Sequence, residues 1–347
     1  MIFIPIPREF IEVYREQGYH FIGKQACVKP CHWLRKALKT GGKYMCYKYR
    51  FFGIPSHRCL QMTPIIQCNL RCVFCWRTHP QDIGIYDWDE TKVDPRDLDD
   101  PETIAENALK EWRRVLSGFI GSPSIPKKLI EEALRPIHVT FSLTGEPFLY
   151  PYLGELVYEF FRRGFRSVFI VTNGTMPEAM SKLEYEPSQL YLSLYGANEE
   201  MFKLTARPLS GNLWSKVLES LELLKSFKCP TVLRLTLVKG FNMERPEEYA
   251  KLVVKAEPTY VEAKAAMALG YFRYRLSNDA MPRHSEIRKF AEKIAEETGY
   301  YIVDESLHSR VVLLCKFKKP IEIIPKDMHP YALSTKETEE YVESDEE

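Results

Sequence analysis

The sequence has no apolar run that approaches the ~20 consecutive residues needed for a membrane-spanning helix. Its start, MIFIPIPREFIEVYREQ, also lacks a basic segment followed by a long apolar stretch, so it does not resemble a signal peptide. These two absences predict a protein of the reducing cytoplasm without membrane association.

An excess of charge of either sign is also absent, because the formal net charge is only +1. The charges are nevertheless unevenly distributed. Residues 1–80 contain 13 Lys and Arg against three acids, residues 81–111 contain 11 acids against three bases, and the stretch from Ile321 contains nine acids against two bases. A basic segment with acidic margins suits binding to a polyanion, but the same pattern is also typical of ordinary solvated surface.

The chain has 347 residues with 45% hydrophobic and 27% charged residues, which is enough to build a sizeable core. Short runs rich in β-branched and aromatic residues alternate with amphipathic stretches. We predict strands at 63–67, 137–143, 167–172, 190–194, 232–238 and 260–266, and helices at 101–119, 212–227, 246–256 and 283–299. The alternation predicts a parallel α/β architecture, which periodicity alone fits equally well as an open sheet or a partial barrel.

The sequence also predicts two helix ends and the domain boundaries. Asn212 is a candidate N-cap and Gly299 a candidate C-cap for two of the helices. Residues 1–60 do not share the alternation, so they are interpreted as an N-terminal extension to an α/β domain over 61–320. The acidic stretch 321–347 is nearly free of apolar residues towards its end and is predicted to be disordered.

Nine cysteines are unusual for a cytosolic protein, in which disulfides are disfavoured. Seven of them fall between Cys27 and Cys75, which points to metal or redox chemistry. The other two, Cys229 and Cys315, have apolar neighbours and are predicted to be core thiols.

The densest cysteines form a C-x3-C-x2-C triplet at Cys68, Cys72 and Cys75. Three thiolates on one short loop can bind three corners of a cubane iron–sulfur cluster and leave the fourth iron open. A structural zinc site normally takes four protein ligands, often from paired C-x2-C units. The spacing therefore favours an open cluster over zinc, with Trp76 as a shield against water.

The triplet, which follows a predicted strand and precedes an aromatic residue, resembles the signature of the radical S-adenosylmethionine (SAM) superfamily. The resemblance implies a partial (β/α)6 barrel with a [4Fe–4S] cluster at the carboxyl end of its first strand. It also implies that SAM chelates the open iron and is cleaved to methionine and a 5′-deoxyadenosyl radical.

Further polar residues follow the later predicted strands, where barrel folds place their chemistry. LTGEP (143–147) matches the glycine–glutamate–proline element of the superfamily, and VTNGT (171–175) and LYLSLYG (190–196) end the next two strands. Turns also favour such residues, so each alone is weak and their ordered recurrence is the stronger signal. The residues predicted to bind SAM are Gly145, Glu146, Thr172, Asn173, Ser193, Arg234 and Asn242. For Arg234 and Asn242, a place in the substrate pocket is the alternative.

The upstream cysteines lie in ACVKPCHWLRKAL (26–38), KYMCYKYRFFGI (43–54) and HRCLQMTPI (57–65). Together with AKAAMALGYFRYRLSNDAMPRHSEI (263–287), these stretches resemble the archaeal 4-demethylwyosine synthase family over roughly residues 20–320. The resemblance implies a second [4Fe–4S] cluster on Cys46, Cys59 and a third cysteine, for which Cys31 is favoured and Cys27 competes.

The same resemblance implies the reaction. Lys48 matches the family lysine that forms a Schiff base with pyruvate. The implied substrate is tRNA-Phe with N1-methylguanosine next to its anticodon, which becomes 4-demethylwyosine. An external electron donor of ferredoxin or flavodoxin type and a monomeric enzyme are also expected.

Contacts to tRNA are expected from cations interleaved with aromatic residues, a combination that suits phosphates and unstacked bases. The candidates are Arg35, Lys36, Arg50, Lys264, Arg273 and Arg275. For any one of them, a solvated side chain on the barrel rim is an equally good interpretation. Two other functions stay open at this point: a radical SAM maturase or activating enzyme, and a zinc-binding module without catalytic activity.

Overall fold

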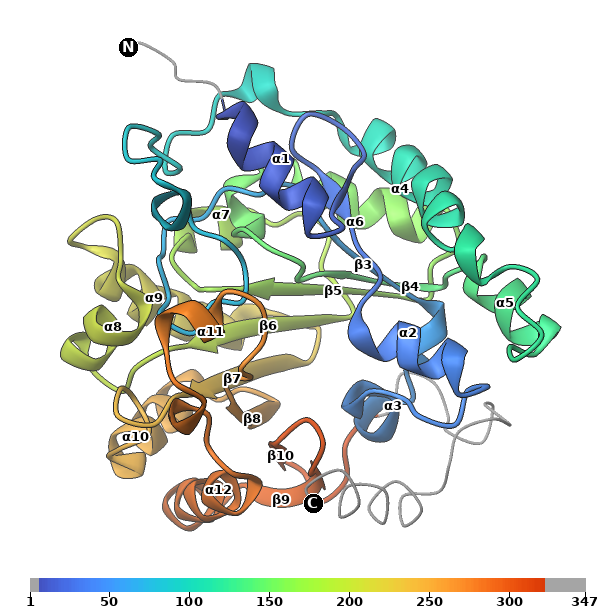
Figure 1. Cartoon of the computed structure of the whole chain (residues 1–347). Helices are drawn as coiled ribbons and strands as arrows, with labels where there is room; N and C mark the ends of the chain where they lie inside the picture. Colours follow the sequence, from blue (N-terminus) through green and yellow to red (C-terminus); the bar gives the residue numbers. More distant parts are fainter. Residues whose placement is uncertain (1–5, 322–347) are drawn as a thin grey trace.

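A curved ten-stranded sheet forms the centre of the computed structural model, which describes residues 6–321 (Figure 1). The strand order is β1-β2-β3-β4-β5-β6-β7-β8-β10-β9. Its six central strands are parallel: β3 (Cys59–Thr63), β4 (His138–Phe141), β5 (Ser167–Thr172), β6 (Gln189–Leu194), β7 (Thr231–Leu237) and β8 (Tyr260–Ala265). This is the six-stranded parallel core that the sequence predicts.

Antiparallel strands extend both edges of this core. β1 (His20–Phe21) and β2 (Cys27–Val28) add to β3, and β10 (Val311–Cys315) and β9 (Tyr301–Ser306) add to β8. Part of the predicted N-terminal extension therefore belongs to the same sheet as the barrel, and β3 itself begins before the predicted boundary at residue 60. The predicted tail over 321–347 lies, apart from Ile321, outside the described residues.

Helices cover the outer face of the sheet (Figure 1). The α-helices are α1 (Arg8–Glu16), α2 (His32–Lys39), α3 (Tyr47–Phe52), α4 (Pro101–Val115), α5 (Lys127–Ala133), α6 (Leu153–Arg162), α7 (Pro177–Met180), α8 (Glu199–Ala206), α9 (Leu213–Leu223), α10 (Pro246–Ala256), α11 (Phe272–Arg275) and α12 (His284–Thr298). Short 3-10 turns are η1 (Ser56–Arg58), η2 (Pro80–Ile83), η3 (Pro95–Asp97), η4 (Ser117–Phe119), η5 (Pro147–Leu149), η6 (Leu224–Ser226) and η7 (Asn278–Ala280). Within residues 6–321, no helix is both long and apolar enough to cross a bilayer.

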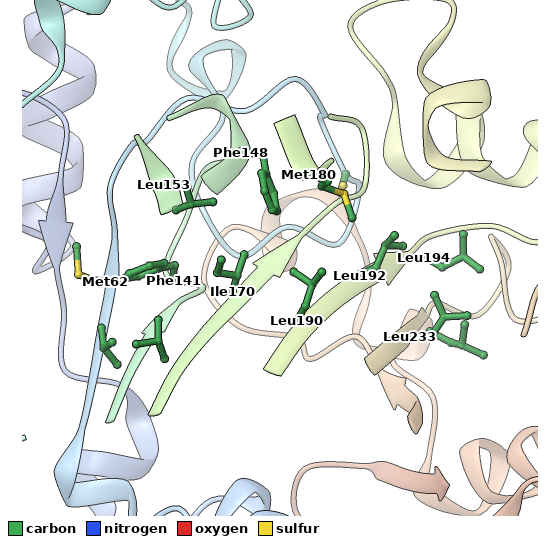
Figure 2. Close-up of a cluster of buried hydrophobic side chains, with 14 of the residues drawn as sticks. Met62, Phe141, Phe148, Leu153, Ile170, Met180, Leu190, Leu192, Leu194 and Leu233 are labelled. Carbon is green, nitrogen blue, oxygen red and sulfur yellow. The ribbon is translucent and has the colours of Figure 1, made fainter. Parts of the chain in front are cut away.

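The main core lies between the sheet and these helices (Figure 2). Alternate residues of a strand point to opposite faces, so Leu190, Leu192 and Leu194 of β6 face outward together and are fully buried. Burial of such side chains contributes about 25 cal/mol per Å² of apolar surface. The outward face is therefore committed to packing, which leaves the inward positions of the same strands for chemistry.

A second apolar cluster closes the amino-terminal end of the barrel. Phe51 and Phe52 of α3 are fully buried against the inward faces of the strands. The Phe52 ring meets the ring of Tyr260, the first residue of β8, at 5.3 Å in an edge-on contact. As a result, α3 plugs this end of the barrel and its first residues point into the interior.

The predicted first strand at 63–67 is wrong, because the strand is Cys59–Thr63 and the chain then leaves the sheet. Pro64 has no N–H to continue the ladder. Instead, the Thr63 hydroxyl lies 2.7 Å from the carbonyl oxygens of both Ile65 and Thr144 and can donate its one hydrogen to either. Residues 64–67 consequently pack against the loop after β4.

Two predicted helix ends have different outcomes. Gly299 caps α12 with φ 74°, in the left-handed conformation that glycine adopts without strain, as predicted. Asn212 is the N-cap residue of α9, as predicted, but its side chain makes no capping hydrogen bond.

Candidate active site

A pocket lies at the carboxyl ends of β3, β4, β5 and β6, where the loops after parallel strands meet at one rim. The residues that line it are Cys68, Leu70, Cys72, Phe74, Cys75, Trp76, Arg77, Ser142, Leu143, Thr144, Gly145, Glu146, Val171, Thr172, Asn173, Ser193 and Tyr195. The structure thus brings together the three cysteines of the triplet and five of the seven residues predicted to bind SAM.

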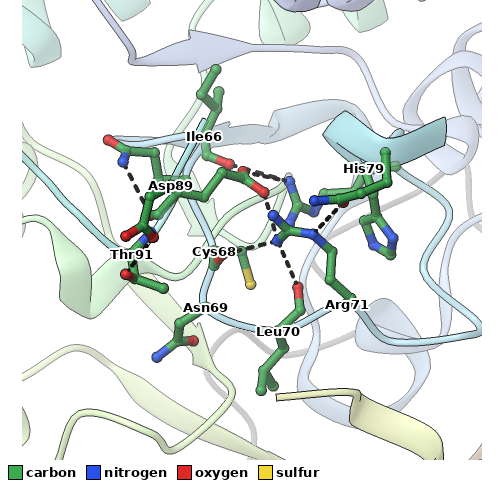
Figure 3. Close-up of polar contacts among 12 residues, drawn as sticks. Ile66, Cys68, Asn69, Leu70, Arg71, His79, Asp89 and Thr91 are labelled. Carbon is green, nitrogen blue, oxygen red and sulfur yellow. Dashed lines mark hydrogen bonds and ion pairs between the residues drawn. The ribbon is translucent and has the colours of Figure 1, made fainter. Parts of the chain in front are cut away.

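The cysteine triplet sits on a loop, residues 66–77, that a buried ion network holds (Figure 3). The fully buried Glu90 pairs with Arg71 at 2.6 Å and with Arg77 at 3.2 Å. Arg71 also donates from Nη1 to the carbonyls of Cys68 (3.2 Å) and Leu70 (3.3 Å). The loop therefore has a defined backbone shape before any cofactor binds.

The thiols of this loop suit an iron–sulfur cluster. All nine cysteines are free, and burial raises the pKa of Cys68 to about 11 and that of Cys72 well above its usual range. The nearby Arg77 opposes both shifts and supplies positive charge for thiolates. Within residues 6–321, no three His, Cys, Asp or Glu side chains converge closely enough to hold a single metal ion. The cysteine ligands of a cubane cluster can lie further apart than those of a single metal ion, because each thiolate binds a different iron.

Glu146 links the ends of β4 and β5 inside the pocket wall. Its carboxylate accepts hydrogen bonds from the Thr172 hydroxyl (2.6 Å), the Asn173 N–H (2.7 Å) and the Phe148 N–H (3.1 Å). Burial outweighs these three bonds and raises the pKa of Glu146 to about 7. Two predicted SAM-binding residues, Thr172 and Asn173, are thus positioned by a third.

Asn173 connects this wall to the cysteine loop. Its side-chain Nδ2 donates to Asn69 Oδ1 at 3.0 Å and lies 3.8 Å from the Cys68 sulfur. Gly145 completes the junction with φ 72°, and a Cβ at this position would lie 2.2 Å from the Ile65 carbonyl oxygen. Only glycine allows the two loops to approach this closely.

Two residues predicted to bind SAM lie outside the pocket lining. Asn242 is fully buried, and its side-chain amide makes three hydrogen bonds to the backbone. It accepts from the Val238 N–H and donates to the carbonyls of Tyr195 and Thr236. Arg234 faces the barrel interior nearer the plugged end, where it pairs with Glu262 at 2.8 Å. A position near a strand end does not by itself place a side chain at the rim.

The upstream cysteines separate into a group of three and a single residue. Cys31 is the N-cap of α2, Cys46 is the N-cap of α3, and Cys59 begins β3. Burial and then the neighbouring Cys46 raise the pKa of Cys31 to about 11. Burial likewise raises the pKa of Cys59, with smaller contributions from Cys31 and Cys46.

Cys27 lies elsewhere. It is fully buried in an apolar cluster with Phe10, Tyr14, Tyr19 and Trp88. Burial raises the pKa of its thiol, and no other cysteine contributes to that shift. The structure therefore brings Cys31, and not Cys27, together with Cys46 and Cys59.

Lys48 projects from α3 into the barrel interior. Its ammonium lies 4.3 Å from the ring centroid of Phe169 on β5 and 4.8 Å from that of Tyr191 on β6. Burial lowers the pKa of Lys48 below its usual value. In the described part of the chain, no oxygen accepts a hydrogen bond from this ammonium, so its contacts are the two aromatic faces.

Next to Lys48 is a polar network of which only Arg234 was predicted as a site residue. Arg234 donates from Nε to Glu262 (2.8 Å) and from Nη2 to the Tyr47 hydroxyl (2.9 Å). Tyr47 in turn donates to Glu262 at 3.4 Å. The one available signal was charge within buried strands, since Arg234 interrupts VLRLTLV and Glu262 interrupts YVEAKAA.

The residues predicted to contact tRNA do not form one group. Arg35 and Arg273 are exposed. Lys36 lies over the rings of Trp33 and Tyr44, Arg50 pairs with Asp304 at 2.6 Å, and the half-buried Lys264 donates to the Ser309 carbonyl at 2.6 Å.

Arg275 has a different position from the one predicted. It donates to the carbonyls of Cys75 (2.6 Å) and Arg77 (2.9 Å) and pairs with Asp82. Its side chain therefore clamps the cysteine loop and does not extend from the surface.

A family model described as the radical SAM superfamily matches residues 62–253, and one described as wyosine base formation matches residues 255–316. A Pyrococcus horikoshii protein named S-adenosyl-L-methionine-dependent tRNA 4-demethylwyosine synthase is 46% identical over 316 residues, 90% of each chain. A Methanocaldococcus jannaschii protein of the same name is 38% identical over 313 residues, 89% of this chain and 96% of that one.

Solved structures give the same result. A structure of TYW1 with a lysine-pyruvate adduct bound matches with a TM-score of 0.80 and 34% identity over 93% of this chain and 100% of that one. A crystal structure of archaeal TYW1 matches with a TM-score of 0.73 and 32% identity, covering 92% and 99%. The predicted fold, a partial barrel of the radical SAM type, is confirmed. The chain belongs to the radical SAM superfamily and, within it, to the tRNA 4-demethylwyosine synthase family.

Proposed function

We propose that this chain converts N1-methylguanosine next to the anticodon of tRNA-Phe into 4-demethylwyosine, with pyruvate as the second substrate. It is a radical SAM enzyme, and its relatives are named as tRNA 4-demethylwyosine synthases. The adduct named in the first solved structure supports a lysine as the pyruvate carrier.

The observation that carries the proposal is the stacking of two sites in one barrel. Lys48 lies against Phe169 and Tyr191. Val171 and Ser193, two residues further along the same strands, line the pocket with the cysteine triplet. Two residues advance a strand by roughly 7 Å, so a pyruvate on Lys48 would sit one layer of side chains below the pocket.

The residues of the pocket fit the cofactors that the superfamily implies. Cys68, Cys72 and Cys75 would hold a [4Fe–4S] cluster, and the wall around Glu146, Asn173 and Ser193 would hold SAM. When bound, this pair supplies the hydrogen-abstracting species that activates the methyl group of the base. The chain contributes position and exclusion of water.

Lys48 would carry pyruvate as an imine. Its nitrogen forms a bond to the carbonyl carbon, and the carbonyl oxygen leaves as water. The aromatic contacts of the ammonium leave it accessible to an incoming carbonyl, since no hydrogen bond within the described residues has to be broken. Phe51 and Phe52 seal the end of the barrel below it.

A second [4Fe–4S] cluster would be held by Cys31, Cys46 and Cys59. Two of these begin helices, where the helix dipole favours thiolates, and Lys48 follows Cys46 by two residues. If this is correct, anaerobic reconstitution should load about eight iron atoms per chain, and a Cys31→Ser/Cys46→Ser/Cys59→Ser variant about four. An unchanged iron content in that variant would rule out the second cluster on these residues.

tRNA would be bound by exposed cations and by cations that lie beside aromatic rings. Exposed Arg35 and Arg273, with Lys36 above Trp33 and Tyr44, combine charge with aromatic surface. We further propose that the enzyme works in the cytoplasm as a monomer and takes electrons from a ferredoxin or flavodoxin.

The test is anaerobic turnover with tRNA-Phe that contains N1-methylguanosine, SAM, a reductant and pyruvate labelled with ¹³C at the carbonyl and methyl carbons. Nucleoside mass spectrometry should find both labelled carbons in the tricyclic base. Cys72→Ser should yield none. Product without label, or labelled product from Cys72→Ser, would contradict the proposal.

A further inference from the structure

Within the described residues, the Arg234 guanidinium donates hydrogen bonds from only one of its edges. Nε and Nη2 form one edge of the group, and this edge faces Glu262 and Tyr47. The opposite edge, formed by Nη1 and Nη2, presents two parallel N–H donors. In the described part of the chain, no residue accepts a hydrogen bond from Nη1. Two parallel donors match the two oxygens of a carboxylate.

This open edge belongs to the environment of Lys48. The Arg234 guanidinium carbon lies 4.6 Å from the centroid of the Tyr191 ring, and the Lys48 ammonium lies 4.8 Å from the same centroid. The two groups are therefore at most about 9.4 Å apart, a gap that a three-carbon acid attached to Lys48 can span. Burial lowers the pKa of Lys48 most, and the Arg234 charge lowers it further, whereas Cys59, Cys46 and Glu262 raise it.

The interior around Lys48 contains groups of both charge signs. Lys48, Arg234 and Lys264 contribute three cations, and Glu262 is the carboxylate that faces them. Glu262 uses one oxygen for Arg234 and Tyr47, while its other oxygen, Oε1, is buried without a hydrogen-bond partner in the described residues. Cys46 and Cys59 also act on Lys48 as negative charges, so a bound carboxylate is favoured by the open Nη1–Nη2 edge of Arg234 and not by an overall excess of positive charge.

Arg234 cannot rotate freely away from this position. Glu262 and Tyr47 both hold the same edge, at 2.8 Å and 2.9 Å, and Glu262 is fully buried. These contacts keep the free edge directed away from its two partners. Glu262 and Tyr47 are thus positioning residues for Arg234.

We propose that Arg234 binds the carboxylate of pyruvate through its free Nη1–Nη2 edge while the carbonyl carbon faces Lys48. This rests on the proposed role of Lys48 and extends it, because it explains why the enzyme would select a 2-oxo acid over a neutral carbonyl compound. Lys264 is the less suitable cation, since its ammonium is held by the Ser309 carbonyl.

The test is reductive trapping on the anaerobically prepared, cluster-loaded enzyme, without SAM or tRNA. Sodium cyanoborohydride converts the Lys48 imine into a stable adduct, and mass spectrometry of the peptide that contains Lys48 measures its yield. The yield is followed against the concentration of pyruvate and, separately, of hydroxyacetone, a carbonyl compound without a carboxylate.

The main variant is Arg234→Met/Glu262→Met, which removes both charges so that neither is left buried alone. Its half-saturating pyruvate concentration should rise about 10- to 100-fold, the range expected when a charged hydrogen-bonded pair is lost. The value for hydroxyacetone should stay unchanged. Arg234→Lys keeps the charge but not the two parallel donors, so its half-saturating pyruvate concentration should fall between those of wild type and the double variant. Arg162→Gln, at an exposed ion pair of α6, is the matched control and should behave as wild type.

The outcomes separate this inference from the function it rests on. If wild type forms no adduct on Lys48, the imine step and the inference both fail. If wild type forms the adduct but the half-saturating concentrations of pyruvate and hydroxyacetone rise equally in the double variant, the inference alone fails. Should the double variant not fold, wild type still decides: similar half-saturating concentrations of the two compounds would overturn a carboxylate-binding role.

Discussion

At the scale of single residues, Glu146 shows how burial can place a titratable group in the wall of a site. It accepts three hydrogen bonds that hold Thr172 and Asn173, yet burial still raises the pKa of Glu146 to about 7. The folded state therefore holds one more proton than the unfolded state between the ordinary carboxyl pKa and about 7. Its contribution to stability is fully present below the ordinary value and is lost as pH rises through 7.

This predicts that Glu146→Gln flattens the pH dependence of stability. Between pH 5 and pH 8, wild type should lose roughly 3 kcal/mol of unfolding free energy through this group, and the variant should not. Urea unfolding of the reduced, cluster-free protein under anaerobic conditions measures the difference. The exposed Glu200→Gln is the control, and identical pH profiles for wild type and Glu146→Gln would contradict the argument.

Arg234 illustrates the limit of inference from a single position. Its place on a predicted strand suggested a SAM contact, but the structure pairs it with Glu262. That pairing depends on the register between β7 and β8, in which Arg234 and Glu262 are directly opposite. Register is a property of two strands, so neither segment reveals it alone.

At the scale of elements, the junction between the loop after β4 and the cysteine loop depends on Gly145. A side chain there would need a positive φ and would meet the Ile65 and Gln67 carbonyl oxygens at 2.2 Å and 2.8 Å. We expect Gly145→Ala to cost about 2–4 kcal/mol of unfolding free energy and to weaken SAM binding.

Gly211→Ala is the matched control for this prediction, because a Cβ at Gly211 meets no atom within 4 Å. Thermal unfolding and equilibrium binding of SAM to the cluster-loaded protein measure both effects. A Gly145→Ala protein with wild-type stability and SAM affinity would show that the close approach of the two loops is unimportant.

The clamp made by Arg275 is a second prediction about elements. Arg275 ties α11 to the cysteine loop through the carbonyls of Cys75 and Arg77. Arg275→Gln should therefore lower the unfolding free energy by about 1–3 kcal/mol and reduce iron retention. It should leave the salt dependence of tRNA binding unchanged. If Arg275 instead contacts a phosphate, the slope of log affinity against log salt would fall by about one, with stability intact.

Much of the barrel could be predicted because its strands are local patterns. The strand predicted at 167–172 has the same bounds as β5, and the predictions at 190–194, 232–238 and 260–266 agree with β6, β7 and β8 to within a residue or so. The two-residue strands β1 and β2 and the hairpin of β9 and β10 were not predicted. Short edge strands form through distant partners and carry little periodicity of their own.

Part of the candidate site could also be predicted from local patterns, and part of it could not. The cysteine triplet and the polar residues after β4, β5 and β6 are marked by spacing, and the structure places them in one pocket. Glu262 and Tyr47 were missed, since their significance comes from contacts between α3, β7 and β8. The family resemblance favoured Cys31 over Cys27, but the spacing of the cysteines could not decide between them, because the choice depends on which thiol lies near Cys46 and Cys59.

At the scale of the whole molecule, apolar side chains close one end of the barrel, and the pocket lies at the other end. α3 plugs the amino-terminal end with Phe51 and Phe52 and directs Lys48 inward. The cysteine loop and the strand-end residues form the pocket at the carboxyl end. Under the proposed function, hydrogen abstraction would occur at the pocket and attachment of pyruvate at Lys48, so the two steps would be separate.

That separation is tested most directly by Lys48→Arg with tRNA-Phe whose N1-methylguanosine has a trideuterated methyl group. Wild type should transfer deuterium to 5′-deoxyadenosine and form the tricyclic base from pyruvate. Lys48→Arg should still transfer deuterium, because the pocket is intact, but should form no tricyclic base. Tricyclic base formed by Lys48→Arg at the wild-type rate, or loss of deuterium transfer together with product, would contradict the account.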